Sequence, residues 1–161
     1  GMVTLATTAA TAQFEAGRKF FGPRLGLSAV GGAPAFRVMF ETAAEDRYGL
    51  GAFADYWSFT SGGREVSIRE RYVAFGGMAN YHFEMDDNRW DPFAGLVLGY
   101  FIVNQKGAYG GIPVPGAEAR ASRVFIGAHG GFRYFLRENM AFVAQGGFGA
   151  SYLAAGLDFV F

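Results

Sequence analysis

Apolar residues alternate with polar or small residues along most of the chain, with a period of two. Eight segments show this pattern: about 23–30, 35–42 and 48–58, a segment running up to 83, then about 93–103, 123–135, 140–148 and 151–161. Successive side chains of an extended strand point to opposite faces, so the pattern predicts eight β-strands. Helical periodicity is almost absent outside residues 9–18, and glycine interrupts much of the remaining chain.

The two faces of these strands differ in charge. One face, here called the apolar face, carries no Asp, Glu, Lys, Arg or His in any of the eight strands. The ionisable residues within the strands all lie on the other face: Arg24, Arg37, Glu41, Asp55, His82, Arg123, His129, Arg133 and Asp158. Strands of about nine to eleven residues suit a tilted crossing of a membrane. We therefore predict an all-β fold, an eight-stranded antiparallel up-and-down transmembrane β-barrel.

Alternation by itself leaves open which face is inside. A soluble, lipocalin-like barrel would turn its apolar face inward and its charges to water. Here the second face is mostly Gly, Ala, Val, Met and Phe, with too few charges for a solvated surface. The same mixture suits the narrow lumen of an eight-stranded barrel. We expect lipid on the apolar face and ion pairs between arginines and carboxylates in the lumen, because an unpaired buried charge is costly.

The links between strands alternate in length. The even-numbered links, AEDR, EMDDNRWD and LRENM, are short and charged, which is typical of periplasmic turns. Two odd-numbered links, TSGGREVSIRER and QKGAYGGIPVPGAEARAS, are long and predict outer loops. Aromatic residues at the strand ends predict two girdles, one of Tyr48, Trp90, Tyr134 and Phe161 and one of Tyr56, Trp57, Tyr100 and Phe101.

Composition agrees with a membrane barrel. Charged residues make up 17% of the 161 residues, against roughly 25% in a typical soluble domain. The net charge is zero, from 14 basic and 14 acidic residues, so no overall field favours nucleic acid as a partner. Cysteine is absent, which excludes disulfides and thiolate metal sites. No run of about 18 apolar residues predicts a transmembrane helix.

The first residues differ from the rest. Gly1-Met2 is typical of a cloning tag, and Ala10-Thr11-Ala12 has the small-x-small form of a signal-peptidase site. We expect residues 1–12 to be a tag plus a residual export signal or, alternatively, a disordered leader. Residues 13–161 form the single barrel domain of this interpretation.

Candidate catalytic chemistry is sparse. His82 and His129 both belong to the lumen face, and no carboxylate cluster has metal-ligand spacing beside them. His129 precedes Gly130-Gly131 and lacks the nearby serine of outer-membrane acyl hydrolases. The charged run IRERY indicates a solvated strand extension rather than a binding patch. We predict no enzyme activity, no catalytic residue, no metal site and no cofactor.

Three segments carry a resemblance to a known family: GLGAFADYWSF, NYHFEMDDNRWDPFAGLVLGYFIVN and GAHGGFRYFLRENMAFVAQGGFGASYLAAGLDFVF. Over about residues 21–161 the chain resembles the small, porin-like outer-membrane β-barrel proteins common in Bacteroidetes and related bacteria. The resemblance implies a small integral barrel of the bacterial outer membrane and no particular activity. It also implies that the last strand, with Leu157, Phe159 and Phe161, resembles the assembly signal read by the barrel-assembly machinery.

These observations favour a structural or interaction role. The partners expected are outer-membrane lipid, the assembly machinery and an extracellular or envelope protein bound through the outer loops, with no nucleic acid. A narrow porin-like channel or a path for a small apolar molecule is the alternative, although eight strands leave little lumen. A soluble lipid-binding barrel is the second alternative.

Overall fold

The computed structural model describes residues 14–28, 32–149 and 151–161. Its regular structure consists of eight strands: β1 (Lys19–Ser28), β2 (Pro34–Glu45), β3 (Tyr48–Gly62), β4 (Val66–His82), β5 (Trp90–Tyr109), β6 (Ile112–Arg137), β7 (Met140–Phe148) and β8 (Ser151–Val160). Within these residues no helix is long and apolar enough to cross a membrane. The expected tag and leader, residues 1–12, lie outside the described residues, so that assignment stays a prediction.

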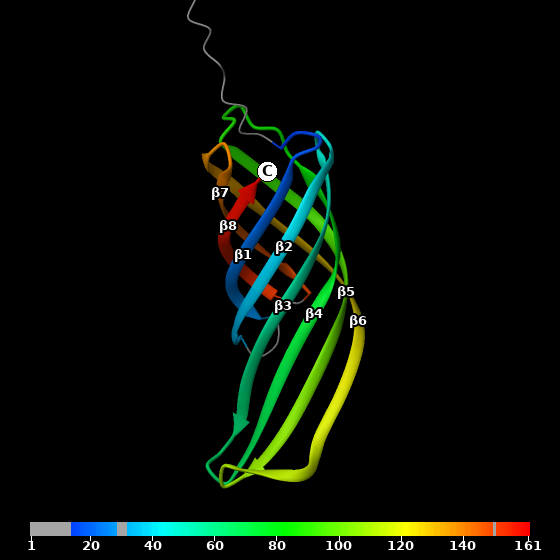
Figure 1. Ribbon diagram of the computed structural model, residues 1–161, viewed down its shortest axis with the longest axis vertical. Helices are drawn as coiled ribbons and strands as arrows, with labels where there is room; N and C mark the ends of the chain where they lie inside the picture. The colour runs from blue at the N-terminus through cyan, green and yellow to red at the C-terminus, as the bar shows by residue number, and fades with distance from the viewer. Residues whose placement is uncertain (1–13, 29–31, 150) are drawn as a thin grey trace, which may run out of the picture.

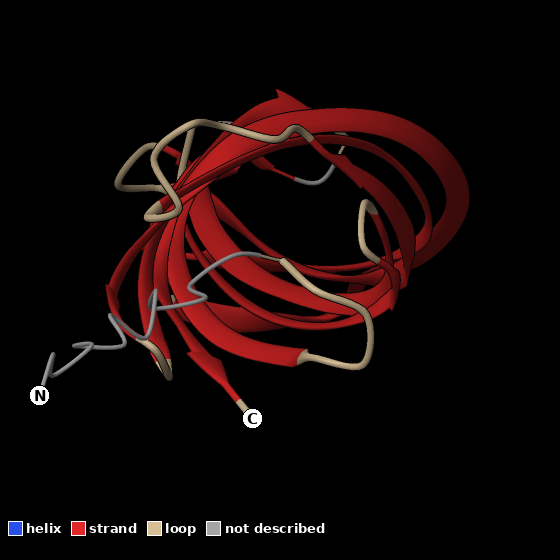
Figure 2. Ribbon diagram, turned by 90° about the horizontal axis from the view of Figure 1, so that it is seen from above, coloured by secondary structure: helices blue, strands red, loops and turns tan. Residues whose placement is uncertain are grey.

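The strands close into one antiparallel barrel in sequence order, which confirms the predicted fold class (Figures 1 and 2). β1 pairs with β8 across the seam, with Phe21 opposite Phe159 and Leu25 opposite Ala155. The backbones of Lys19 and Phe161 exchange hydrogen bonds of 3.0 Å beside this seam. Closure leaves no free sheet edge in this part of the barrel.

Four strands continue beyond the closed barrel. β2 pairs with β3 no farther than Trp57, and β7 pairs with β6 only from Ala128 onward. Past these positions β3, β4, β5 and β6 form a four-stranded sheet, here called the protruding sheet, at the end opposite Phe161 (Figure 1). The end that carries Phe14 and Phe161 is called the terminal end.

The expectation of two long outer loops is therefore wrong. Residues 66–73 and 101–109 continue the two-residue alternation of their strands, and pairing with neighbours satisfies their backbone groups. The real turns are short. Gly110 and Gly111 form one of them with φ of 57° and 81°, a conformation that glycine adopts without strain.

The exterior of the closed barrel is apolar. Leu25, Leu96 and Ile126 are 70%, 65% and 78% exposed, and each of the eight strands has exposed apolar side chains of this kind. A water-soluble barrel of the lipocalin type would bury these residues and expose its arginines. The structure has the opposite polarity, so the soluble-barrel alternative is wrong.

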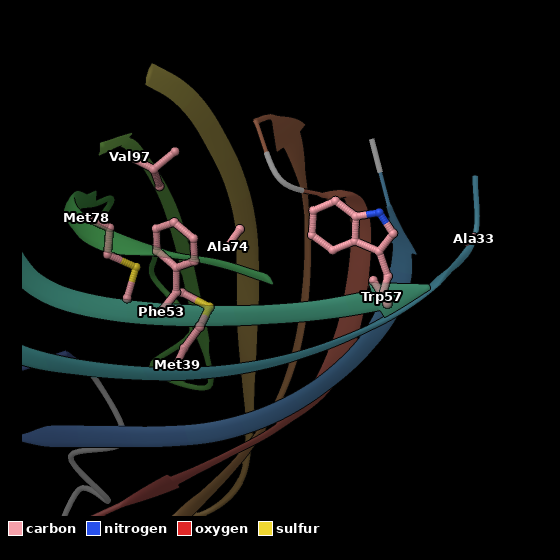
Figure 3. Packing of buried hydrophobic residues seen from close by; sticks show 8 residues of the cluster. Ala33, Met39, Phe53, Trp57, Ala74, Met78 and Val97 are labelled. Carbon is pink, nitrogen blue, oxygen red and sulfur yellow. The ribbon is translucent and has the colours of Figure 1, made fainter. Parts of the chain in front are cut away.

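The lumen holds two apolar clusters at different heights. The cluster at the terminal end contains Phe14, Phe20, Ala43, Phe135, Ala141 and Val160. The far cluster contains Ala33, Ala35, Met39, Phe53, Trp57, Ala74, Met78 and Val97, several of which point into one space in Figure 3. Along β2, Glu41 lies between Met39 of the far cluster and Ala43 of the terminal one. Polar side chains therefore occupy the layer between the two clusters.

The aromatic girdles are only partly as expected. Near the terminal end, the rings of Trp90 and Tyr134 pack edge to face on the exterior, with centroids 5.0 Å apart. Tyr56 is exposed near the far end, but its neighbour Trp57 is fully buried in the lumen. Phe101 likewise packs against the far cluster. The pleat explains the correction, because consecutive residues of one strand cannot both face outward.

Candidate functional site

Arg133 of β6 is the centre of a buried ionic network in the lumen. Its Nε donates to Oδ2 of Asp158 at 2.6 Å, its Nη1 donates to Oδ2 of Asp91 at 3.3 Å, and its Nη2 donates to Glu41. Phe20 lies over the guanidinium, with Cζ 4.4 Å from the ring centroid. Three carboxylates from β2, β5 and β8 thus surround one buried cation, and each hydrogen bond is charge-assisted.

His82 and Asn80 extend this network across β4. The His82 ring has Asp91 Oδ1 2.6 Å from its Nδ1 and Glu41 Oε1 3.2 Å from its Nε2. Asn80 donates to Glu41 Oε1 at 2.6 Å, and its Oδ1 lies 2.6 Å from Nε2 of His129. The polar layer consequently joins β2, β4, β5 and β6 through side chains, in addition to the backbone ladder.

Two further arginines form ion pairs in the lumen, Arg24 within the polar layer and Arg37 between Ala35 and Met39 of the far cluster. Arg24 of β1 donates through Nη2 to both carboxylate oxygens of Asp158, at 2.9 and 3.0 Å. Arg37 of β2 makes a two-point contact with Asp55 of β3, at 2.5 Å on each arm. Each of these four side chains is buried. Breaking such a pair leaves an uncompensated buried charge, which costs several kcal/mol.

Glycine gives the network its space. A Cβ added at Gly22 would lie 1.9 Å from Oδ1 of Asp158, and one added at Gly49 would lie 2.1 Å from Oε1 of Glu41. Any side chain at these positions would displace a carboxylate from its arginine. Polar side chains therefore occupy the space beside the small residues of the lumen face, so that these residues leave no open path through the lumen.

The polar layer still has unmatched atoms. Within the described part of the chain, Nε and Nη1 of Arg24, Nδ1 of His129 and Oε1 of Gln145 are buried without a protein partner. Buried polar atoms of this kind are normally bonded by internal water. In the same residues, no group of three or more His, Cys, Asp or Glu is arranged to hold a metal ion.

Most of the sequence-predicted residues lie in the lumen. The structure brings Arg24, Arg37, Glu41, Asp55, His82, His129, Arg133 and Asp158 inside the barrel. The inclusion of Arg123 is wrong, because its side chain is exposed on the protruding sheet. Arg123 has the lumen-facing parity of β6, but it lies five residues beyond Ala128, where pairing with β7 stops. Alternation determines on which face of the strand a residue lies, but not its position along the barrel axis.

Two members of the network were missed in the sequence. Asp91 was assigned to a charged turn, yet it is the second residue of β5 and is buried. The sequence signal that could have found Asp91 is its position in the alternation, since it is an even number of residues from the lumen-facing Phe93 and Val97. Asn80 was placed on the lumen face but not among the site residues, because it carries no charge.

Phe14 covers the network at the terminal end. Its ring stacks on His82 with centroids 3.5 Å apart and an interplanar angle of 8°. A cavity of about 360 Å³ opens beside it and is lined by Asp46, Glu84 and Asp91. Phe14 thus separates most of the buried ion pairs from the solvent at this mouth.

The protruding sheet has an aromatic inner face. The rings of Trp57 and Tyr72 stack at 5.0 Å, and those of Phe101 and Phe125 approach to 4.3 Å. A cavity of about 540 Å³ at the edge of β6 is bounded by Tyr72, Phe101, Val103 and Phe125, by Ala121, Ser122 and Arg123, and by the outward-facing Val124 and Ile126. The recess therefore reaches from the aromatic inner face, past Arg123, to the apolar exterior.

The same edge of β6 has free backbone groups. Among the described residues, β6 pairs with β5 from Ile112 onward but with β7 only from Ala128 onward. Along residues 112–127, the backbone N–H and C=O groups on the side away from β5 thus have no neighbouring strand among the described residues. An exposed strand edge of this length can accept a further strand.

Comparison with known proteins identifies the architecture. No protein-family model and no curated protein matches the sequence. The solved N-terminal β-barrel domain of Pseudomonas aeruginosa OprF is similar, at 14% identity and a TM-score of 0.66, over 91% of this chain and 98% of that one. The P. aeruginosa outer membrane protein OprG matches at 12% identity and a TM-score of 0.66, over 93% of this chain and 98% of that one.

A third similar structure is Ail, the attachment invasion locus protein of Yersinia pestis. It matches at 10% identity and a TM-score of 0.60, over 91% of this chain and 99% of that one. Ail has also been solved in complex with the heparin analogue sucrose octasulfate. Identities this low show a shared fold, that of small outer-membrane barrels, and leave function to be argued from the site.

Proposed function

We propose that this protein is an integral barrel of the bacterial outer membrane, with an interaction role carried by its protruding sheet. The observation that carries the proposal is the reversed polarity of the barrel, which has charges in the lumen and exposed Leu, Ile and Phe outside. An apolar belt without ionisable residues is stable against hydrocarbon and unstable against water. The resemblance to outer-membrane barrels supports the same conclusion.

The interaction role rests on the free edge of β6 and the aromatic face beside it. Unpaired backbone groups along residues 112–127 offer hydrogen bonds to an extended segment of a partner. Side chains of that segment would reach the recess formed by Tyr72, Phe101 and Phe125. The partner class is therefore an extracellular or envelope protein that presents an extended strand.

Surface labelling of single-cysteine variants tests this placement. The chain has no cysteine, so each variant carries one reactive thiol. In Ser61→Cys the thiol lies in the protruding sheet, and in Asp86→Cys it lies in the link at the terminal end; both positions are exposed. We expect a membrane-impermeant maleimide to label Ser61→Cys on intact cells and Asp86→Cys only after permeabilisation of the outer membrane. Equal labelling of both in intact cells would overturn the proposed orientation.

A second candidate function is passage of a small apolar molecule. The recess at the edge of β6 favours it, because the recess joins aromatic side chains of the inner face to the exterior at Val124 and Ile126. An aqueous pore is not favoured, since Arg133 and its carboxylates fill the lumen.

Conductance separates the channel from the closed barrel. In planar bilayers we expect the wild-type protein to give no stepwise ion current, because the buried ion pairs occupy the cross-section of the lumen. Regular current steps that scale with salt concentration would favour a pore instead, and would require the network to open.

Two finer assignments belong to the same proposal. We propose that Leu157 and Phe159, which are exposed on β8, and Phe161, which follows it, form the segment that the barrel-assembly machinery recognises. We also propose an origin among Bacteroidetes-like bacteria, supported by the resemblance of the three sequence segments described above. Neither assignment changes the chemistry of the site.

A further inference from the structure

Basic residues form a compact group on the outward face of the protruding sheet. Arg69 and Arg71 of β4, Asn104 and Lys106 of β5 and Arg120 of β6 share this face and are here called the basic patch. Backbone pairing places Arg71 opposite Asn104 and Asn104 opposite Arg120 in one row. It places Arg69 opposite Lys106 in the next row. Four cations thus lie within two rows of neighbouring strands, with Glu118 of β6 opposite Lys106 in the second row, in a protein whose net charge is zero.

The basic patch begins where the apolar exterior ends. Along β4 the outward residues are Phe75, then Val73, then Arg71; along β5 they are Ile102, then Asn104. Consecutive outward residues of a strand are about 6.6 Å apart. The first charged row consequently lies one such step beyond the last apolar row. In a membrane-embedded barrel, that height belongs to the lipid headgroups.

The side chains of the basic patch supply donors for an anion. Arg69, Arg71, Asn104 and Lys106 line a small hollow of about 140 Å³. Glu70, the acidic residue between the two arginines, faces the other side of the sheet and accepts a hydrogen bond from Gln105. Alternation therefore separates the charges of the IRERY run, and only its cations reach the outward face.

We propose that the basic patch binds the phosphate group of an anionic lipid headgroup in the outer leaflet. The guanidinium groups of Arg69, Arg71 and Arg120 can form paired, charge-assisted hydrogen bonds with phosphate. Clusters of basic residues beside a membrane surface attract anionic lipids. This inference rests on the proposed function, because only a barrel in a membrane holds the patch at headgroup height.

Lipid titration in detergent micelles tests the assignment. The probes are phosphatidic acid, which carries a phosphomonoester, and diacylglycerol, which has the same acyl chains without phosphate. Bound lipid is counted by mass spectrometry of the intact complex. The variant is Arg69→Gln with Arg71→Gln and Arg120→Gln, and the matched control is Arg123→Gln, on the other face of the same sheet. Each surface charge is expected to contribute about fivefold in affinity.

We expect wild-type protein and Arg123→Gln to bind phosphatidic acid with affinities within about twofold of each other, and the triple variant to bind it at least tenfold more weakly. Diacylglycerol should bind all three equally poorly. Retention of phosphatidic acid binding by the triple variant, or equal binding of both lipids, would overturn the inference. Displacement of the lipid by inorganic phosphate at similar concentration would assign the patch to a soluble phosphate and overturn the lipid source.

Gel mobility of the same samples separates two kinds of failure. A folded barrel in detergent migrates differently before and after boiling. If wild-type protein needs no detergent and shows no such shift, the proposed membrane function fails. If it shows the shift and binds no phosphatidic acid, the basic-patch inference alone is overturned.

Discussion

Replacement of Arg133 by methionine is expected to destabilise the barrel by about 3–5 kcal/mol, since it removes the single cation that three buried carboxylates share. Methionine has a similar length and no charge, so Glu41 and Asp91 would lose one cationic partner while remaining buried. Asp158 would keep only its contact with Arg24. The loss should be visible as a large fall in the urea concentration that unfolds the barrel in lipid vesicles.

The matched control is Arg123→Met. Arg123 lies on the same strand and the same face as Arg133, but it is exposed on the protruding sheet. Its replacement should change the unfolding free energy by less than about 0.5 kcal/mol. Unfolding is followed by tryptophan fluorescence and by heat-modified gel mobility. Equal stability of the two variants would contradict a central role of Arg133 in holding the lumen together.

Replacement of Leu98 by arginine is the second large effect expected. Leu98 faces outward near the middle of β5, between Gly77 of β4 and Ile126 of β6, and is 57% exposed. An arginine near the midplane of a bilayer costs about 2–4 kcal/mol in a transmembrane barrel. In a water-soluble protein, an arginine at so exposed a position would be almost neutral. The measurement therefore reports on the solvent around the apolar exterior.

Thr60→Arg is the control for this prediction. Thr60 is exposed in the protruding sheet, beyond the closed barrel, and its strand neighbour in β4 is Arg69. We expect its replacement to leave the unfolding free energy in lipid vesicles nearly unchanged. Both variants are compared with wild type in vesicles of uncharged lipid, so that headgroup attraction does not contribute. A Leu98→Arg barrel as stable as Thr60→Arg would contradict the assignment of the exterior to lipid.

Much of the fold could be predicted from alternation. A strand of period two divides its residues between two faces, whatever its partners are. The absence of ionisable residues from one face in eight successive segments therefore predicted the strands, and the small, sparsely charged residues of the other face predicted that the apolar face lies outside. The same parity rule assigned Arg24, Arg133 and Asp158 to the lumen, where the structure places them in contact.

Strand ends were harder to predict than strand faces. Asp91 lies at the start of β5, next to a charged link, and local composition there resembles a turn. Residues 60–71 were assigned to a loop because the link is long, although the run IRERY within it was interpreted as a strand extension, which the structure confirms. In the structure, pairing with β5 satisfies the backbone groups of residues 66–71 and alternation spaces their charges. Pairing with a neighbour depends on a second segment and cannot be inferred from either segment alone.

The sequence by itself determined the number of strands and the face of each residue, because these follow from local geometry. Only the tertiary structure decided which residues meet across the lumen. The height of a side chain depends on the tilt and stagger of strands in the closed barrel, a property of all eight pairings together. That stagger brings Glu41, Asp91 and Asp158 to one guanidinium. It also carries Arg123, with the same parity as Arg133, out of the lumen and onto the protruding sheet.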